Sequence, residues 1–528
     1  MHFIAEYDWI LLTIFVYLLV KLLRKQARGS SPPGPRGLPF VGNAYQIPSD
    51  RQWLKFDEWI QEYGDVVQVN IMSQPTVILG SVKAATELLD YRGLIYSDRP
   101  PAVMAGELVG WNRGLGYSPG PHSPRFREFR RLFHRFMGSR QVQDSSLLTT
   151  QEENAAELLL RLLNTPQDFM THVRQSTGAL ILRLTFGYNV AEDQAEDPLV
   201  KIVEKAMQGF ARASEPGTFL VDSIPILKHI PSWVPGAGFK REAANMRRDL
   251  EELYDVPYTF VKNEMSKGPV TPSFVSTYIE EKGAPTLEEE DLIKAAAASL
   301  YSGGADTTPS SLASFILAMC LHPEIQARAQ EEVDSILGLD WHRLPTFSDR
   351  ESLPYVNAIV LELLRWNPAV PLGLAHQLTQ DDVYRGWHLR KGTVVWANIW
   401  TMLHDEAVFF HPFEFRPDRF LDEGGNPLPL DPKTDPVIGF GFGRRICPGM
   451  YFADNSIFIA VVMMLYAFTI TRANGPDGHV IIPEAEYGGF IAHPRPFKCT
   501  IKPRSPAAEA LIRQTVRSTG NARHTAHR

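Results

Sequence analysis

The feature that most constrains this chain is one cysteine, Cys447, in a glycine-rich and basic loop over residues 440–449. A cysteine thiolate is one of the few side chains that can bind haem iron. Gly441, Gly443 and Gly449 would allow the backbone to approach a flat cofactor and would leave amide N–H groups free to point at the sulfur. Cys447 taken alone is also consistent with a buried structural cysteine, so the rest of the chain has to decide between these interpretations.

The spacing within this loop matches a known motif. Arg445, two residues before the cysteine, could reach an anionic group such as a haem propionate. The stretch resembles the haem-binding loop of the cytochromes P450, Phe-x-x-Gly-x-Arg-x-Cys-x-Gly, at every fixed position. The resemblance implies haem b with Cys447 as its axial iron ligand and four further cofactor-binding residues, which are Phe440, Gly443, Arg445 and Gly449.

A second stretch breaks the rules of the element that contains it. Residues 292–321 are apolar and predict a long helix, yet residues 303–308 place two glycines, an acid and two hydroxyl groups in its middle. An interior glycine costs roughly 0.5–1 kcal/mol relative to alanine, and burying a carboxylate costs more. Local rules broken inside an element indicate function. A helix kinked at glycine with a surface aspartate is the alternative.

The same six residues resemble the Ala/Gly-Gly-x-Asp/Glu-Thr-Thr/Ser motif of the P450 helix that crosses the haem. The resemblance implies that Gly303 and Gly304 open a groove for dioxygen beside the cofactor. It also implies two catalytic residues. The Thr307 hydroxyl would hydrogen-bond to dioxygen, and Asp306 would help to deliver protons through water.

A predicted helix over residues 354–366 carries the expected scaffold for the cysteine loop. Glu362 and Arg365 are three residues apart and share a helix face, which alone is a common surface pair worth roughly 0.2–0.5 kcal/mol. P450s bury this pair and join it to an arginine of a later loop, for which Arg419 is the match. We expect a structural role, because removing one member would leave a buried charge unpaired.

Further haem contacts are implied on a basic amphipathic helix that begins near Phe126. P450s usually carry Trp-x-x-x-Arg here, and both side chains bond a haem propionate. Phe126 replaces the tryptophan and has no donor, so Arg130 is expected to keep the charged contact. His376, in an extended segment, is a further propionate candidate, with an ordinary surface histidine as the alternative.

Apolar residues of three segments are expected to form the wall of a substrate pocket. They are Val103, Met104 and Trp111 in an irregular loop over residues 100–123, then Val370, Leu372 and Leu374, and finally Phe490 and Ile491. Another apolar segment, residues 219–239, is interrupted by prolines. It is either a long core loop or a second membrane contact, because exposed apolar patches usually face a partner.

Composition excludes some functions. The chain has 528 residues and a formal net charge of −7, so no basic excess indicates nucleic-acid binding. Three cysteines in so long a chain do not make a disulfide framework, which suits a body in the reducing cytosol. Length alone would suggest several domains, but the order of the motifs fits one fold.

The N-terminus predicts a membrane anchor. An apolar run over residues 9–20 has acidic residues before it and basic residues after it, so we expect an uncleaved transmembrane helix within residues 1–29 and a cytosolic body. A cleavable signal peptide is the alternative. The resemblance implies the endoplasmic reticulum membrane. Residues 30–48 are expected to form a proline-rich hinge, residues 49–505 the P450 haem domain, and residues 506–528 a disordered tail.

The expected fold is mainly α, a single P450 fold with a small N-terminal β-sheet that includes paired strands within residues 66–79, plus the transmembrane helix. The resemblance implies a monooxygenase that acts on an apolar small molecule and receives NADPH electrons through NADPH–cytochrome P450 reductase, with cytochrome b5 as a second candidate donor. A terpenoid, polycyclic aromatic or steroid-like substrate fits, and overall similarity indicates fungal secondary metabolism or detoxification. The alternatives are a thiolate-haem isomerase or peroxygenase and a non-catalytic haem sensor.

Overall fold

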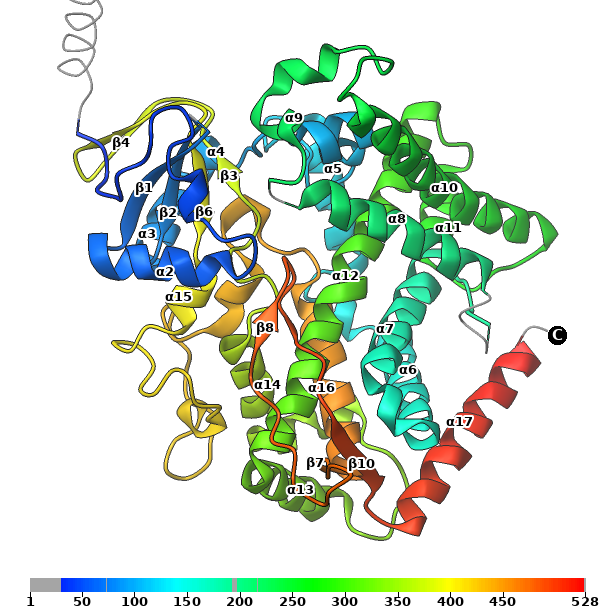
Figure 1. Cartoon of the computed structure of the whole chain (residues 1–528). Coiled ribbons are helices and arrows are strands. Elements are labelled where there is room, and N and C mark those ends of the chain that lie inside the picture. The colour runs from blue at the N-terminus through cyan, green and yellow to red at the C-terminus, as the bar shows by residue number, and fades with distance from the viewer. Residues whose placement is uncertain (1–29, 73, 192–196, 216, 527–528) are drawn as a thin grey trace, which may run out of the picture.

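The computed structural model describes residues 30–526 apart from 73, 192–196 and 216, and it shows a mainly helical fold with small β-sheets (Figure 1). The predicted anchor, residues 1–29, lies outside the described residues. The helices before residue 270 are α2 (Gln52–Tyr63), α3 (Val82–Ala85), α4 (Gly93–Tyr96), α5 (Pro124–Met137), α6 (Ser145–Asn164), α7 (Phe169–Phe186), α8 (Pro198–Ser214), α9 (Leu220–Ser223) and α10 (Gly238–Lys267). The later helices are α11 (Phe274–Lys282), α12 (Leu287–Leu321), α13 (Pro323–Leu337), α14 (Pro354–Trp366), α15 (Ile399–Leu403), α16 (Met450–Ala467) and α17 (Pro506–Ala526).

A four-stranded sheet with the order β1-β2-β6-β3 lies at one side of the helices (Figure 1). Its first two strands are antiparallel with Val66 opposite Leu79, which confirms the paired strands predicted within residues 66–79. Strand β6 pairs in parallel with β2 and antiparallel with β3. The strands are β1 (Val66–Ile71), β2 (Gln74–Leu79), β3 (His376–Gln377), β4 (Asp382–Tyr384), β5 (Trp387–Leu389), β6 (Val394–Ala397), β7 (Phe468–Arg472), β8 (Tyr487–Gly488), β9 (His493–Pro494) and β10 (Cys499–Pro503).

Two apolar helices, α12 and α16, pack together in the helical part of the fold (Figure 1). Helix α16 is apolar around its whole circumference, as expected of a core helix. By length and composition it is the one helix of the described chain that could cross a membrane, but 78% of it is buried inside the protein. Helix α12 confirms the prediction for residues 292–321. It begins at Leu287, where Thr286 and Glu289 form a reciprocal capping box.

The predicted Glu362–Arg365–Arg419 cluster is present and buried. Glu362 Oε2 accepts hydrogen bonds from Arg365 Nε at 2.7 Å and from Arg419 Nε at 3.0 Å. Helix α14, which carries the first two residues, also packs against the turn η10 (Pro436–Phe440) that leads into the cysteine loop. The cluster therefore braces that loop from behind.

Two expectations were wrong in detail. The loop over residues 100–123 contains two short helices, η3 (Val103–Val109) and η4 (Trp111–Arg113). The tail expected to be disordered forms α17, in which Ala508, Leu511 and Ile512 are buried and the helix packs against α6. Their spacing of three and four residues is an amphipathic stripe, which the polar composition of the segment concealed.

Candidate active site

The cysteine loop holds Cys447 by its backbone. It runs from η10 through η11 (Gly443–Arg445) into α16, and the Cys447 N–H donates to the Phe440 carbonyl at 2.9 Å. Burial raises the pKa of the Cys447 thiol, while the Gly449 N–H directed at the sulfur and the nearby charge of Arg130 act to lower it. The amide N–H and the charge of Arg130 would both stabilise a thiolate at this position.

The glycines of the loop serve two different purposes. Gly443 has a φ of +58°, and a Cβ there would lie 2.1 Å from the Leu89 carbonyl oxygen, so only glycine fits against η2 (Thr86–Tyr91). Gly443 therefore secures the loop to its neighbour, and its role in the approach of the cofactor stays a prediction. A Cβ at Gly449 would lie 4.0 Å from the Cys447 sulfur. This glycine therefore brings its own N–H close to the sulfur.

Basic side chains from four separate parts of the chain surround this loop, and the first two are Arg445 and Arg130. Arg445 donates to the carbonyl oxygens of Ser97, Leu115 and Ser118, and Arg130 of α5 donates to that of Ile446 at 2.6 Å. Within the part of the chain that the structure describes, no salt bridge to a carboxylate is found for either guanidinium. The predicted residues Arg130 and Arg445 are thus brought together beside Cys447.

His376 and Arg99 complete this cluster. His376 is buried in β3, which excludes the surface alternative, and its Nδ1–H donates to the Tyr96 carbonyl at 2.7 Å. Arg99 donates to the carbonyls of Leu374 and Ala375 on the same segment. We define Arg99, Arg130, Arg445 and His376 as the cation cluster. Sequence reasoning missed Arg99, because a single arginine in a Pro-flanked loop carries no periodic or spacing signal.

Burial and the neighbouring arginines both disfavour positive charge within the cation cluster. Burial first, and then the charge of Arg99, lowers the pKa of His376 to about 3. Burial, with the charge of Arg130 adding to it and Asp98 opposing it, lowers the pKa of Arg445 to about 10. An anionic group between these side chains would relieve the repulsion. The two propionates of haem fit this requirement, with Cys447 available for the iron.

The oxygen stretch of α12 is the half-exposed part of an otherwise buried helix. Residues 302–307 are partly or fully exposed, while nearly all residues on both sides are buried. A Cβ on Gly303 would meet nothing within 4 Å, and Thr307 lies one turn further along the same face, with its hydroxyl donating to the Gly303 carbonyl at 2.9 Å. This face of α12 therefore borders open space.

Gly304 lies on a different face from Gly303. A Cβ there would lie 2.9 Å from Cδ1 of Ile181 on α7, so this glycine permits α7 and α12 to pack closely. Thr308, one turn after Gly304, is buried on the same side. Only Gly303 therefore borders open space, and the groove for dioxygen stays a prediction.

Asp306 is held by two basic side chains. His493 Nε2 lies 3.0 Å from Asp306 Oδ1, and Arg174 Nε of α7 lies 3.8 Å from the same oxygen. Burial acts to raise the pKa of Asp306, but the hydrogen bond and charge of His493 and the charge of Arg174 outweigh it, so the pKa is lowered overall. Asp306 is therefore ionised at neutral pH. Sequence reasoning missed His493, which is 187 residues away along the chain.

The expected wall residues differ in their surroundings. Val103, Met104 and Trp111 are buried, and the Trp111 ring packs edge-on against Phe210 of α8 with ring centres 4.8 Å apart. Leu372 is also buried, whereas Leu374 and Phe490 are exposed. Val370 and Ile491 are partly buried.

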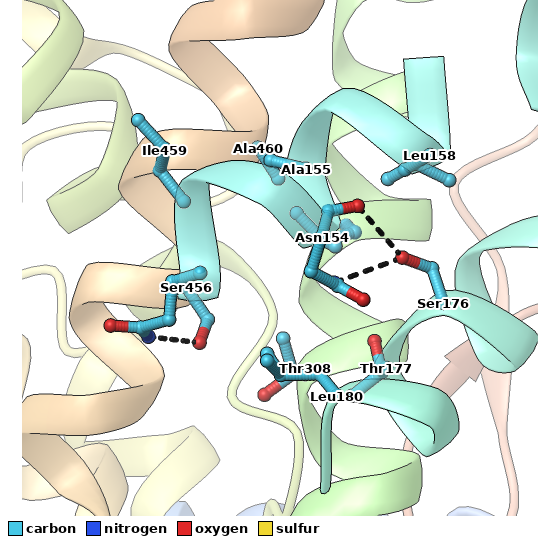
Figure 2. Close-up of a pocket in the computed structure, with 12 residues that line it drawn as sticks. Asn154, Ala155, Leu158, Ser176, Thr177, Leu180, Thr308, Ser456, Ile459 and Ala460 are labelled. Carbon is cyan, nitrogen blue, oxygen red and sulfur yellow. Dashed lines mark hydrogen bonds between the residues drawn. The ribbon is translucent and has the colours of Figure 1, made fainter. Parts of the chain in front are cut away.

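A small cavity lies between α6, α7, α12 and α16 on the Gly304–Thr308 side of α12 (Figure 2). Its volume is about 20 Å³, enough for about one water molecule. Polar groups line it, including Thr308, Asn154 and Ser176, and the Asn154 Nδ2 group donates to Ser176 Oγ at 3.0 Å (Figure 2). It is far too small for an organic substrate, so we treat it as a hydration site separate from the cysteine loop.

Comparisons with known proteins agree with this geometry. The family model described as Cytochrome P450 matches residues 32–501. Cytochrome P450 monooxygenase 208 of Postia placenta is 46% identical over 502 residues, which cover 94% of this chain and 96% of that protein. Cytochrome P450 monooxygenase claR of Ampulloclitocybe clavipes is 41% identical, and the match covers 95% of this chain and 91% of that protein. Cytochrome P450 monooxygenase COX2 of Coprinopsis cinerea is 40% identical, with 92% of each chain covered.

Proposed function

The chain belongs to the cytochrome P450 family of monooxygenases, and we propose that it inserts one oxygen atom of dioxygen into an apolar small molecule. The other oxygen atom leaves as water, and the reaction consumes two electrons and two protons. The electrons come from NADPH through a partner reductase, with cytochrome b5 as a second candidate donor. Haem, when bound, supplies the iron at which dioxygen is activated.

The observation that carries this proposal is the position of Cys447 beside the cation cluster. A sulfur that faces the Gly449 N–H, next to buried cations with no carboxylate partner in the described chain, suits a dianionic haem with a thiolate ligand. When haem is bound, Cys447 would hold the iron, and the side chains of the cation cluster would hold the propionates. Phe440 contributes its carbonyl, which fixes the cysteine backbone.

The half-exposed stretch of α12 provides the remaining groups. The Thr307 hydroxyl can donate a hydrogen bond into the open space beside Gly303 once it releases the Gly303 carbonyl. Asp306, ionised and next to Thr307, can accept a proton and pass it on. We assign the hydroxyl to orientation of dioxygen and the carboxylate to proton delivery.

We further propose that the protein works at the endoplasmic reticulum membrane with its body in the cytosol. Between residues 219 and 239, the side chains of Leu220, Ile226 and Trp233 are 66%, 70% and 80% exposed, which argues against a core loop and for a membrane contact. The apolar run within residues 1–29 would supply the anchor.

We propose an apolar substrate on the basis of the expected wall residues. A terpenoid, a polycyclic aromatic or a steroid-like molecule suits the apolar side chains of Val103, Met104 and Trp111, and we propose a role in fungal secondary metabolism or detoxification. Expression with a fungal reductase and a panel of these three classes, analysed by mass spectrometry, should give products 16 mass units heavier that depend on NADPH. Product formed with peroxide but not with NADPH would instead support a peroxygenase.

The ligand assignment has its own test. Cys447→Ala should lose the carbon-monoxide difference band near the Soret region, because no thiolate then faces the iron. Cys320→Ala, which removes a buried cysteine of α12, should keep that band. A normal band in Cys447→Ala would overturn the assignment.

The oxygen site is tested by coupling, the product formed per NADPH consumed. Thr307→Ala should lower coupling and release hydrogen peroxide, because dioxygen loses its hydrogen-bond donor. Thr308→Val, at the buried neighbouring residue that faces the small cavity, is the control and should couple as the parent does. Equal coupling in all three proteins would refute the role of Thr307.

A further inference from the structure

The C-terminal hairpin places one histidine beside α12. Strands β8 and β9 pair with Tyr487 opposite Pro494, and they lie next to α12 (Figure 1). The connecting Ala492 is fixed through its carbonyl, which accepts hydrogen bonds from Ser310 Oγ of α12 at 2.7 Å and from Asn367 Nδ2 at 3.0 Å. The next residue, His493, is thereby held against the helix by buried backbone contacts rather than by its own side chain.

His493 contacts the carboxylate assigned to proton delivery. Its Nε2 lies 3.0 Å from Asp306 Oδ1, and a carboxylate oxygen can only accept, so Nε2 carries the proton. The side chain of His493 is 15% exposed and that of Asp306 is 37% exposed. The imidazole is therefore in contact both with the acid and with solvent.

We propose that His493 is a positioning residue for Asp306 that also supplies it with protons from solvent. The inference rests on the proposed function, because it concerns the two protons that each monooxygenation consumes. Those protons originate in bulk water and have to reach a site bordered by α12. Asp306 is the carboxylic acid of the half-exposed stretch 302–307, and His493 is the histidine in contact with it.

The transfer balances without any further reactant. An imidazolium at His493 gives its Nε2 proton to the Asp306 carboxylate, which leaves a neutral imidazole and a neutral carboxyl group. The carboxyl group releases that proton towards the oxygen site and becomes a carboxylate again. A solvent hydronium ion then returns a proton to the imidazole and becomes water. One proton has moved inward, and no electrons have moved.

The other charged groups around Asp306 cannot perform this step. Arg174 of α7 lies 3.8 Å away, but a guanidinium does not release its proton in proteins. Tyr301 of α12 senses the charge of Asp306, and burial raises the pKa of its phenol far above neutrality. Arg174 thus helps to keep Asp306 ionised, while imidazole is the side chain that ordinarily changes charge between pH 5 and 8.

The test compares His493→Gln with the parent in the full chain reconstituted with reductase. Glutamine can still donate a hydrogen bond but cannot carry a proton between water and carboxylate. The probe is 7-ethoxycoumarin, or the panel compound with the largest 16-unit product. We expect coupling at pH 7 to fall roughly tenfold, less than the roughly 10²–10⁴-fold effect of a direct general acid or base, because His493 acts through Asp306, and the solvent deuterium isotope effect on product formation to increase.

The pH profile separates a proton relay from simple packing. Coupling in the parent should change with pH, because an imidazole relay exchanges protons with water, whereas coupling in His493→Gln should be low and flat. The double variant His493→Gln/Asp306→Asn should be no worse than Asp306→Asn, because both act through one carboxylate. Arg174→Gln is the matched control and should keep the pH-dependent limb.

A spectroscopic readout is independent of turnover. With ¹³C-labelled histidine, the resonance that disappears in His493→Gln should change position in Asp306→Asn. Parent-like coupling and isotope effect in His493→Gln would overturn the proposal, as would an unmoved resonance in Asp306→Asn. If the parent itself lacks the carbon-monoxide band or forms no product with NADPH, the proposed function fails instead.

Discussion

The guanidinium carbon of Arg445 lies 4.3 Å from the centre of the Phe126 ring. Phe126 is buried on α5, and Arg445 belongs to the cysteine loop more than 300 residues later. The phenyl ring lacks the indole N–H expected at this position, yet it still supports the loop arginine by a cation–π contact. Compared with tryptophan, Phe126 lacks a hydrogen-bond donor but still orients the Arg445 guanidinium.

Phe126→Leu tests that role. Loss of the ring should lower the free energy of unfolding by about 1–2 kcal/mol and should speed haem transfer to apomyoglobin several-fold, because Arg445 is less well oriented for a propionate. Phe133→Leu is the control, since Phe133 is equally buried on α5 and stacks on Phe129. It should lose stability without faster haem loss. Equal haem transfer in both variants would contradict the orienting role.

Glu362→Gln tests the brace behind the loop. Glu362 is fully buried and receives Arg365 and Arg419, so its neutralisation leaves two guanidinium groups uncompensated. Breaking a buried pair from one side costs roughly 3–5 kcal/mol, and we expect little folded, haem-loaded protein by carbon-monoxide difference spectroscopy.

The control for the brace is Asp418→Asn, which breaks an exposed pair with Arg328 in the same region. An exposed pair contributes roughly 0–1 kcal/mol, so this variant should fold and load haem normally. A Glu362→Gln protein as stable as Asp418→Asn would show that the buried cluster is dispensable.

Much of this architecture follows from local sequence patterns. Helix α12 is predicted from its long apolar run, and the paired strands β1 and β2 are predicted from alternating apolar residues. The Glu362–Arg419 contact and the role of the cysteine loop were implied by the resemblance to P450 motifs. The helix and the strands depend on residues close in sequence, so local patterns are sufficient to predict them.

The remaining features depend on partners that are distant in sequence. Gly303 and Gly304 are adjacent and chemically identical, and only Ile181 of α7 distinguishes the face that packs from the face that stays open. Arg99 and His493 act through contacts with residues far away along the chain. Helix α17 was missed because its few apolar residues become meaningful only when α6 is there to cover them.

Gly443→Ala tests the close approach that anchors the cysteine loop. The added Cβ would lie 2.1 Å from the Leu89 carbonyl oxygen, so either the cysteine loop or η2 must move. The carbon-monoxide band should therefore be lost or greatly weakened. Gly441→Ala is the matched control, because its φ is also positive but its Cβ would meet nothing within 4 Å. It should lose only roughly 1–2 kcal/mol from backbone strain and keep its band. Equal loss of the carbon-monoxide band in both variants would mean that backbone strain, and not the contact with Leu89, accounts for the effect of Gly443→Ala.

The cation cluster makes a prediction about pH. In the haem-free protein the pKa of His376 is about 3, because burial and then the charge of Arg99 disfavour the imidazolium. An unfolded histidine binds its proton near pH 6.5. Between pH 3 and pH 6.5 the unfolded chain binds one more proton at this histidine than the folded protein does. The contribution of His376 to the free energy of unfolding is therefore complete above pH 6.5 and is lost as the pH falls. At pH 5 the loss is about 2 kcal/mol.

His376→Gln should remove that loss. The free energy of unfolding of the haem-free variant, measured with urea, should therefore fall less between pH 7 and pH 5 than that of the parent. In haem-loaded protein the difference should shrink, because propionates would offset the charges of Arg99 and Arg445 and make the imidazolium easier to form. His404 is the control: burial and then the charge of Arg365 lower its pKa to about 3 as well, but it lies beside the Glu362 brace. The benefit of His404→Gln at pH 5 should therefore be the same with and without haem. A His376→Gln effect that haem leaves unchanged would mean that the propionates do not lie against the cation cluster.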